Sequence, residues 1–332
     1  MKIAILDDYQ DAVRHLDAFR MLDGHEVKVF HNSTRGLGQL AIRLAPFDAL
    51  VLIRERTAFP RALLARLPNL RLISQTGKVS GHVDVAAATE LGIAIAEGVG
   101  SPVAPAELAW ALIMAASRKI VPYANNLKEG LWQTASINPV LNGLGRTLKG
   151  RTLAIWGYGK IGRMMAGYGK AFGMQVMVWG SAASRQAAQD DGHQAAPSRA
   201  AFFEQADVLT LHLRLGDATR GIVTAEDLAR MRHDALFVNT SRAELVADGA
   251  LEEALRRGRP GHAALDVFTD EPLAPDAPLL KIPTVLATPH LGYVEKDSYE
   301  LYFSKAFENV VNFANGNPTN ILNPDAVGKR PS

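Results

Sequence analysis

The sequence predicts an α/β protein with two doubly wound parallel sheets, and three observations support this fold class. Short apolar runs rich in β-branched residues alternate with helix-compatible stretches along the chain. These runs fall into two series, separated by a segment rich in Gly and Pro at 98–102. The chain has 332 residues, which corresponds to about two domains of ordinary size.

The composition is that of a globular protein, and it excludes several functional classes. Hydrophobic residues make up 48% and charged residues 21% of the chain. The 36 Lys and Arg balance 34 Asp and Glu, so a net charge of +2 provides no basic field for nucleic acid. The chain has no cysteine, which excludes a disulfide scaffold, a thiolate metal site and a cysteine nucleophile. We expect no metal.

The apolar segments predict neither export nor membrane insertion. The first, Ile3–Leu6, is short and is followed by Asp7 and Asp8, whereas a secretory signal needs a longer apolar core. The most apolar later stretch, Leu108–Ser117, has about half of the roughly 20 residues that a membrane span requires. We therefore expect a soluble, cytoplasmic protein with no membrane partner.

The first series of elements opens the chain. Its predicted strands are Lys2–Leu6, Glu26–Phe30, Ala49–Ile53, Arg71–Gln75 and Ile93–Ala96. Helices are predicted between them at Asp11–Leu22 and Phe59–Leu67. After the Gly- and Pro-rich segment, Ala106–Ile120 is apolar on nearly all sides. A helix of this kind must be buried all round, between domains or between subunits.

The second series fills most of the remaining chain. Its predicted strands are Thr152–Trp156, Gln175–Trp179, Val208–Leu211, Ala235–Asn239, Ala263–Val267 and Thr284–Ala287. A last helix is predicted at Asp297–Asn315, and because no strand follows it, it most simply packs on the first domain. We expect one domain at 1–102 plus 291–332 and another at 103–290. The tail from Asn323 has no periodicity and is expected to be loose.

A glycine-rich turn connects the first strand of the second series to a helix. Its residues are Gly157, Tyr158, Gly159, Lys160, Ile161 and Gly162. A G-x-G-x-x-G pattern in a strand–helix–strand context is typical of dinucleotide binding. The glycines allow a tight turn and a close approach of the pyrophosphate, which the helix N-terminus attracts. A glycine-rich turn without a ligand is the alternative.

The next strand ends without the acid that usually binds the adenosine ribose. Gly180 and Ser181 follow Trp179, and Arg185 comes four residues later. A missing carboxylate removes the repulsion of a 2′-phosphate, and Arg suits phosphate. Arg185 could instead be a solvated helix residue. The sequence therefore favours NADP, with NAD as the alternative.

Three ionisable residues follow later strands, at the edge where doubly wound sheets bind ligands. They are Arg242, Glu271 and His290. A histidine suits proton transfer near neutral pH, a carboxylate beside it favours the charged ring, and an Arg fork binds a carboxylate. Together they predict reduction of a 2-keto acid by a nicotinamide cofactor. Singly, each has a simpler explanation: a loop salt bridge, a turn before Pro272, or a satisfied loop histidine.

On these motifs the chain resembles the D-isomer-specific 2-hydroxyacid dehydrogenase family, which includes phosphoglycerate dehydrogenase and glyoxylate/hydroxypyruvate reductase. The resemblance covers almost the whole chain. Besides the glycine turn, it rests on 239–242 with 248–251, on 266–273 and on Thr288–Gly292. It implies a flavodoxin-like substrate domain, a Rossmann dinucleotide-binding domain and a homodimer, in which the apolar helix from Ala106 would suit the interface.

The resemblance also implies roles for individual residues. Arg242 would hold the substrate carboxylate and carbonyl, and Glu271 would pair with His290, the acid/base. Asp266 would help to hold the nicotinamide amide. Thr240 and Ser241 would line the cofactor site.

The resemblance also implies a substrate-domain loop at 76–84, where backbone groups near Lys78 and Val79 would meet the substrate. Asp84 is expected to cap a helix. Arg54 matches a loop that reaches an anionic substrate tail in phosphoglycerate dehydrogenases, although a salt bridge to Glu55 or a solvated Arg is equally compatible with the sequence.

Departures from the family pattern weaken the narrower assignment to phosphoglycerate dehydrogenase. Gly180 replaces the usual acid, His82 a common Asn, Arg214 a common Pro and Tyr293 a smaller residue. Two rival hypotheses remain open: a non-catalytic dinucleotide sensor or corepressor on the same fold, and a related formate or phosphite dehydrogenase. The identity of the 2-hydroxy acid and the direction of the reaction remain open as well.

Overall fold

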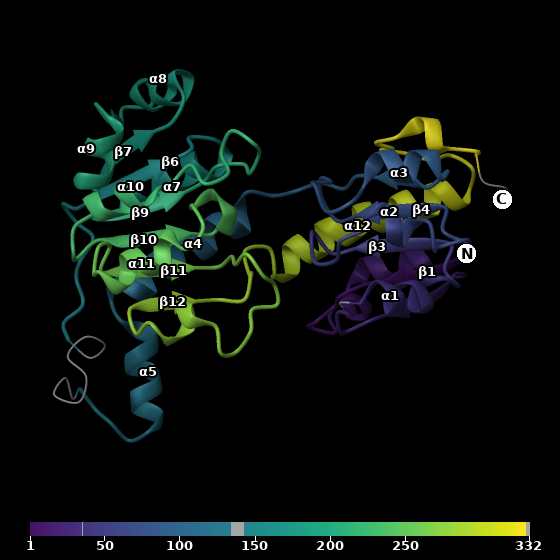
Figure 1. Ribbon diagram of the computed structural model, residues 1–332, viewed down its shortest axis with the longest axis horizontal. Helices are drawn as coiled ribbons and strands as arrows, with labels where there is room; N and C mark the ends of the chain where they lie inside the picture. Colours follow the sequence, from purple (N-terminus) through teal and green to yellow (C-terminus); the bar gives the residue numbers. More distant parts are fainter. Residues whose placement is uncertain (35, 134–142, 330–332) are drawn as a thin grey trace. The chain divides into compact units, whose positions relative to one another are not determined.

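The computed structural model describes residues 1–34, 36–133 and 143–329, which form two compact units (Figure 1). Unit 1 comprises Met1–Ser101 and Glu295–Ser332, and unit 2 comprises Pro102–Val294. The chain therefore returns to unit 1 four residues later than we expected. Segment 291–294 belongs to unit 2 because the Leu291 and Gly292 N–H groups bind the Asp266 carboxylate at 2.7 and 2.9 Å.

Unit 1 contains a five-stranded sheet in which every neighbouring pair is parallel. Its strands are β1 (Lys2–Ile5), β2 (Glu26–Val29), β3 (Ala49–Leu52), β4 (Leu72–Gln75) and β5 (Ala94–Ala96). Their order is β2-β1-β3-β4-β5, which is the flavodoxin-like order. All five strands lie where the sequence predicts them, and the expected fold class of this unit is confirmed.

The connections of unit 1 differ in part from the prediction. The α-helices are α1 (Leu37–Leu44), α2 (Arg61–Leu64) and α3 (Val85–Glu90). The single helix expected at Asp11–Leu22 is wrong: the segment forms two 3-10 helices, η1 (Val13–His15) and η2 (Asp17–Leu22), because Leu16 between them is extended. The Asp84 carboxylate accepts the Ala87 N–H at 2.9 Å, so the predicted cap of α3 is confirmed.

The last helix packs on unit 1, along β3 and β4 (Figure 1). This helix is α12 (Lys296–Ala314). Its Ala306 carbonyl accepts a hydrogen bond from the Ser74 hydroxyl at 2.8 Å, and its Phe307 ring packs edge-on against Phe19. The tail beyond it is not loose as expected. Asn323 is buried, and its side chain accepts the Ile95 N–H at 2.7 Å ahead of η5 (Pro324–Ala326).

Unit 2 contains a seven-stranded sheet, again parallel throughout. Its strands are β6 (Thr152–Trp156), β7 (Gln175–Trp179), β8 (Gln194–Ala195), β9 (Val208–Leu211), β10 (Leu236–Asn239), β11 (His262–Leu265) and β12 (Val285–Ala287). The order is β12-β11-β10-β9-β6-β7-β8. It contains the doubly wound dinucleotide-binding order, which reverses between β6 and β9. The short β8 was not predicted, because two residues carry too little pattern.

The helices of unit 2 lie between its strands in sequence and before the first of them. They are α4 (Val103–Ser117), α5 (Ile120–Lys128), α7 (Lys160–Ala171), α8 (Ala182–Asp190), α9 (Arg199–Glu204), α10 (Ala225–Arg230) and α11 (Ala250–Arg256), with short 3-10 turns η3 (Ala243–Leu245) and η4 (Pro278–Lys281). Among the helices of the described ranges, none is long and apolar enough to cross a bilayer.

The apolar helix expected at 106–120 is α4, and it is not buried all round within this chain. Ala106, Ala109 and Ile113 are buried in the core beneath the sheet, whereas Val103 on another face is 45% exposed. Helix α5 extends away from the sheet (Figure 1) and has no buried residue.

Candidate active site

The glycine turn at the carboxyl end of β6 has the shape that a dinucleotide requires. Gly157 has a φ of +102°, and a Cβ there would overlap the backbone carbonyl of His212, at the end of β9. A Cβ at Gly162 would overlap the Gly157 carbonyl, so α7 packs tightly on the turn. Gly159 caps α7, and a Cβ on it would meet open space. These features leave the helix N-terminus accessible to an anion.

The side chain of Tyr158 anchors this turn, which the sequence did not reveal. Tyr158 is buried, its hydroxyl donates to the Asp191 carboxylate at 2.8 Å, and burial raises its pKa to about 12. Arg163 also pairs with Asp191 and lies over the Tyr158 ring. The turn is thereby tied to the end of α8.

The segment after β7 holds Arg185 close to the strand end. The Arg185 guanidinium lies 4.7 Å from the Trp179 ring centroid and donates to the Gly180 carbonyl at 3.3 Å. Ser181 caps α8 by accepting the Ser184 N–H at 3.2 Å. Gly180 has a φ of +150°, and a Cβ there would lie 3.4 Å from Ser184, so a side chain at residue 180 would be strained.

Two of the three predicted catalytic side chains are in direct contact. His290 Nδ1 lies 2.6 Å from Glu271 Oε2, and the two side chains are 23% and 35% exposed. Burial alone would raise the pKa of Glu271. The hydrogen bond from His290 and its charge, the hydrogen bond from the Phe268 N–H and the charge of Arg242 outweigh this effect of burial, so the pKa is lowered. Glu271 therefore stays ionised and can stabilise a protonated imidazole.

Arg242 lies close enough to this pair for its charge to act on Glu271. It follows β10, whose last residue, Asn239, donates to the Arg242 carbonyl at 2.8 Å and accepts the Ser241 N–H at 3.0 Å. The Ser241 hydroxyl donates to the Leu211 carbonyl at the end of β9. Thr240 lies in the same loop, so the predicted cofactor-lining residues 240 and 241 follow β10 directly.

The loop that carries His290 is fixed by two residues whose role the sequence did not show. Asp266 is fully buried, and its carboxylate accepts the Thr288 hydroxyl at 2.7 Å as well as the two loop N–H groups described above. Burial raises the pKa of Asp266, and these hydrogen bonds and the charge of His290 offset the increase only in part. The ring of Tyr293 packs edge-on against His290, with centroids 5.6 Å apart. His290 itself has a φ of +53°.

In unit 1, the structure brings Arg54 to the loop that contains Lys78 and Val79. A Cβ at Gly77 would overlap the Arg54 guanidinium, so the side chain lies directly against the loop backbone. Arg54 has a φ of +51°, and the Thr76 hydroxyl accepts its N–H at 3.1 Å. The three residues predicted to meet the substrate thus lie at the carboxyl ends of β3 and β4.

Lys78 and Val79 already share a partner within unit 1. Lys78 Nζ lies 2.7 Å from Glu97 Oε2, and the Val79 N–H donates to Glu97 Oε1 at 2.9 Å. Glu97 follows β5 and was not singled out by the sequence, because a glutamate after a short strand is unremarkable without its neighbours.

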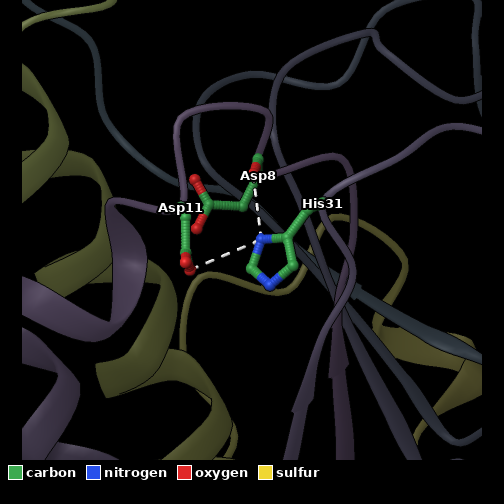
Figure 2. Close-up of side chains that lie close together, drawn as sticks. All are labelled: Asp8, Asp11 and His31. Carbon is green, nitrogen blue, oxygen red and sulfur yellow. Dashed lines mark hydrogen bonds and ion pairs between the residues drawn. The ribbon is translucent and has the colours of Figure 1, made fainter.

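Three side chains of metal-binding type lie close together after β1 and β2: Asp8, Asp11 and His31 (Figure 2). The Asp8 carboxylate accepts the Ala12 and Val13 N–H groups at 3.2 and 3.0 Å, and His31 Nδ1 lies 3.2 Å from the Asp8 carbonyl. These contacts fix the turn into η1. They account for the cluster without an ion.

A hollow of about 100 Å³, partly open to solvent, lies in unit 2 at the amino ends of β11 and β12. Its lining includes Ala116, Lys119, His262 and Leu286. Burial and the nearby cations lower the pKa of His262, so its ring is neutral. Because ligands of doubly wound sheets bind at the carboxyl edge, this hollow is separate from the candidate active site.

Comparison with known proteins agrees with this geometry. Residues 110–292 match the model of the D-isomer specific 2-hydroxyacid dehydrogenase NAD binding domain. The chain is 36% identical over 272 residues to glyoxylate reductase from Aeropyrum pernix, covering 81% of each. It is similar in structure to a phosphoglycerate oxidoreductase from Vibrio cholerae (59% identity, 95% and 99% of the two chains, TM-score 0.92). An oxidoreductase from Ralstonia solanacearum has 55% identity, 98% coverage of both chains and a TM-score of 0.95.

These matches and the two parallel-sheet units identify an NAD(P)-dependent oxidoreductase that acts on the CH–OH group of 2-hydroxy acids. The chain belongs to the D-isomer specific 2-hydroxyacid dehydrogenase family.

Proposed function

We propose that His290 is the acid/base of this reaction and that Glu271 and Arg242 complete the catalytic group. The observation that carries this proposal is the 2.6 Å contact between His290 and Glu271, next to Arg242. In the direction of reduction, protonated His290 gives its proton to the carbonyl oxygen of the keto acid. Glu271 stabilises the imidazolium through Nδ1, which leaves Nε2 for the substrate. Arg242 binds the substrate carboxylate through its two-point fork.

The nicotinamide cofactor, when bound, supplies or receives the hydride. We propose that the glycine turn, 157–162, binds its pyrophosphate and that Thr240 and Ser241 line its nicotinamide side. Asp266, which the resemblance also placed there, is fully buried and holds the His290 loop instead. The free space beside Gly159 and the accessible N-terminus of α7 support this. We further propose that Gly180, Ser181 and Arg185 bind the adenosine ribose of NADP in preference to NAD. The fixed position of Arg185 against Trp179 supports a phosphate contact over a solvated arginine.

The substrate is proposed to be a small 2-keto or 2-hydroxy acid of the D series, contacted also by Arg54 and by backbone groups at Lys78 and Val79. The names of the relatives leave two substrate classes open, because one is a glyoxylate reductase and another a phosphoglycerate oxidoreductase. Both differ from a non-catalytic sensor, the rival on the same fold, in that they turn over a keto acid.

We also propose a cytoplasmic homodimer. Support for the dimer comes from α5 and its surroundings, where Ile120, Leu127, Trp132 and Leu144 are 52%, 56%, 71% and 97% exposed. Large apolar side chains that are exposed along one segment favour an interaction surface. The cytoplasm is proposed because it supplies both nicotinamide cofactors and small 2-keto acids.

The experiment that tests the proposed function is a panel of small 2-keto acids assayed with NADPH and with NADH. We expect turnover of at least one keto acid, a D-configured product and higher catalytic efficiency with NADPH. Absence of turnover with every keto acid and both cofactors would support the sensor hypothesis. Turnover of formate or phosphite alone would support the other rival.

A further inference from the structure

Among the described residues, three cations lie close to the proposed substrate loop at the carboxyl edge of unit 1, and each has a partner in this unit. They are Arg54, Arg56 and Lys78. The Arg56 guanidinium donates to the Asp7 carbonyl and lies 4.6 Å from the Tyr9 ring centroid. It therefore braces the end of β1. The other two pair with carboxylates that follow β3 and β5.

The Glu97 carboxylate binds Lys78 in the way a substrate carboxylate would. One oxygen receives the ammonium and the other receives the Val79 N–H. A carboxylate with a charged donor on one oxygen and a backbone donor on the other is a strong, oriented contact. In this arrangement the positive charge of Lys78 is compensated by the protein itself.

Glu97 is the fixed member of this pair. Its N–H donates to the Asn320 carbonyl at 2.9 Å, and its own carbonyl accepts the Asn309 side chain at 3.1 Å. Its side chain is 16% exposed, whereas that of Lys78 is 74% exposed. The backbone of Glu97 is therefore held by α12 and by the segment after it, and the exposed Lys78 side chain lies against its carboxylate.

Arg54 is compensated in a similar way. Its Nε lies 3.9 Å from Glu55 Oε2, and the two side chains are only 23% and 20% exposed. Glu55 also accepts the Ser80 hydroxyl at 3.4 Å, which links it to the substrate loop. Two of these three cations thus pair with a carboxylate of this unit.

We propose that Glu97 and Glu55 set the substrate class of this enzyme: 2-keto acids with a single carboxylate and no phosphate or sulfonate group. The proposal rests on the proposed function, because it assumes that Arg54, Lys78 and Val79 contact the substrate. A phosphate would add about 1.5 to 2 negative charges at neutral pH. Such a group would require cations here that no carboxylate neutralises, but it would meet the carboxylates of Glu97 and Glu55.

The test compares catalytic efficiency for glyoxylate and for 3-phosphohydroxypyruvate in the wild type, Glu97→Gln, Glu55→Gln and a control. Glutamine keeps an acceptor for the Val79 N–H and removes only the charge. Glu90→Gln is the matched control, because Glu90 pairs with Arg61 at 2.7 Å in α3, away from the substrate loop. We expect the wild type to favour glyoxylate. We expect Glu97→Gln to shift the efficiency ratio about three- to tenfold toward the phosphorylated acid, and Glu90→Gln to leave it unchanged.

Two further measurements separate charge from structure. The shift should shrink in 0.5 M salt, since the added interaction is partly exposed. It should also disappear when Lys78→Gln is combined with Glu97→Gln, because the uncompensated ammonium is then absent. A wild type that favours the phosphorylated acid, or a Glu97→Gln variant with an unchanged ratio, would overturn this inference alone. Failure of the wild type to reduce either acid with either cofactor would instead overturn the proposed function.

Discussion

The carboxyl edges of the two units differ in chemistry although both belong to doubly wound parallel sheets. In unit 2, β6 is followed by glycines, and the helix N-terminus beyond them is accessible. In unit 1, β1 and β3 are followed by polar and charged residues that bind one another: Thr57 donates to the Asp7 carboxylate, and Arg56 donates to the Asp7 carbonyl. One edge leaves a helix N-terminus accessible, and the other is occupied by its own side chains.

The difference shows that strand order alone does not make a ligand site. The order reverses between β1 and β3 in unit 1 and between β6 and β9 in unit 2, and such a reversal opens a crevice. In unit 2 the ends of β6 and β9 approach closely because Gly157 has no side chain to collide with the His212 carbonyl, and open space remains beside Gly159. In unit 1 the side chain of Asp7 follows β1, and its burial raises its pKa.

The largest effect is expected when the proposed proton donor at the edge of unit 2 is replaced. His290→Gln should lower the turnover number for keto-acid reduction by about a hundredfold or more, because a neutral amide cannot donate the proton. Binding of NADPH, followed by its fluorescence, should persist because the glycine turn is unchanged. His15→Gln, an exposed histidine in η1, is the control. Near wild-type turnover in His290→Gln, under conditions where chemistry limits the rate, would remove His290 from its role.

Arg242→Lys tests how the same edge recognises the substrate carboxylate. Lysine keeps the charge but loses the two-point fork, so catalytic efficiency should fall by about tenfold to a hundredfold. Both KM and the turnover number should change, because the contact also orients the carbonyl. Steady-state kinetics with glyoxylate measure this, and an unchanged efficiency would place Arg242 outside the site.

Arg185→Ala tests whether the segment after β7 in unit 2 sets the preference between NADPH and NADH. A phosphate–arginine contact is worth roughly 1.5–3 kcal/mol, so the preference for NADPH over NADH should fall by about ten- to a hundredfold. The efficiencies with the two cofactors give this ratio. The reverse change, an acid at residue 180, is a poor test because Gly180 has a φ of +150°. A ratio that Arg185→Ala leaves unaltered would mean that this side chain does not meet the cofactor.

Glu271→Gln is expected to have a smaller effect, visible mainly as a change with pH. The pKa of Glu271 is lowered, so its stabilising contribution is complete above its ordinary value of about 4.3 and is lost as the pH falls through the lowered value. The melting temperatures of wild type and variant should therefore converge as the pH falls through that lowered value. The turnover number should fall by about tenfold, because the imidazolium loses its carboxylate partner. An unchanged turnover number would show that Glu271 does not act on His290.

The sequence by itself determined the fold class and most strands of both sheets. Buried parallel strands are continuous apolar runs, and the glycine turn has a fixed spacing, so both are visible without tertiary information. The catalytic group could be proposed for a similar reason: Arg242, Glu271 and His290 each follow a predicted strand or its loop, and parallel strands end at a common edge.

Only the tertiary structure decided which polar groups these residues meet. Asn323 looked like part of a loose tail, but it binds the Ile95 N–H of β5, a partner 228 residues away. Tyr158 and Asp191 form the anchor of the glycine turn, and Glu97 compensates Lys78, although no local pattern connects either pair. The physical reason is the same in each case. Apolar periodicity reports whether a residue is buried, whereas a hydrogen bond or an ion pair depends on the position of a second group that the chain brings in from elsewhere.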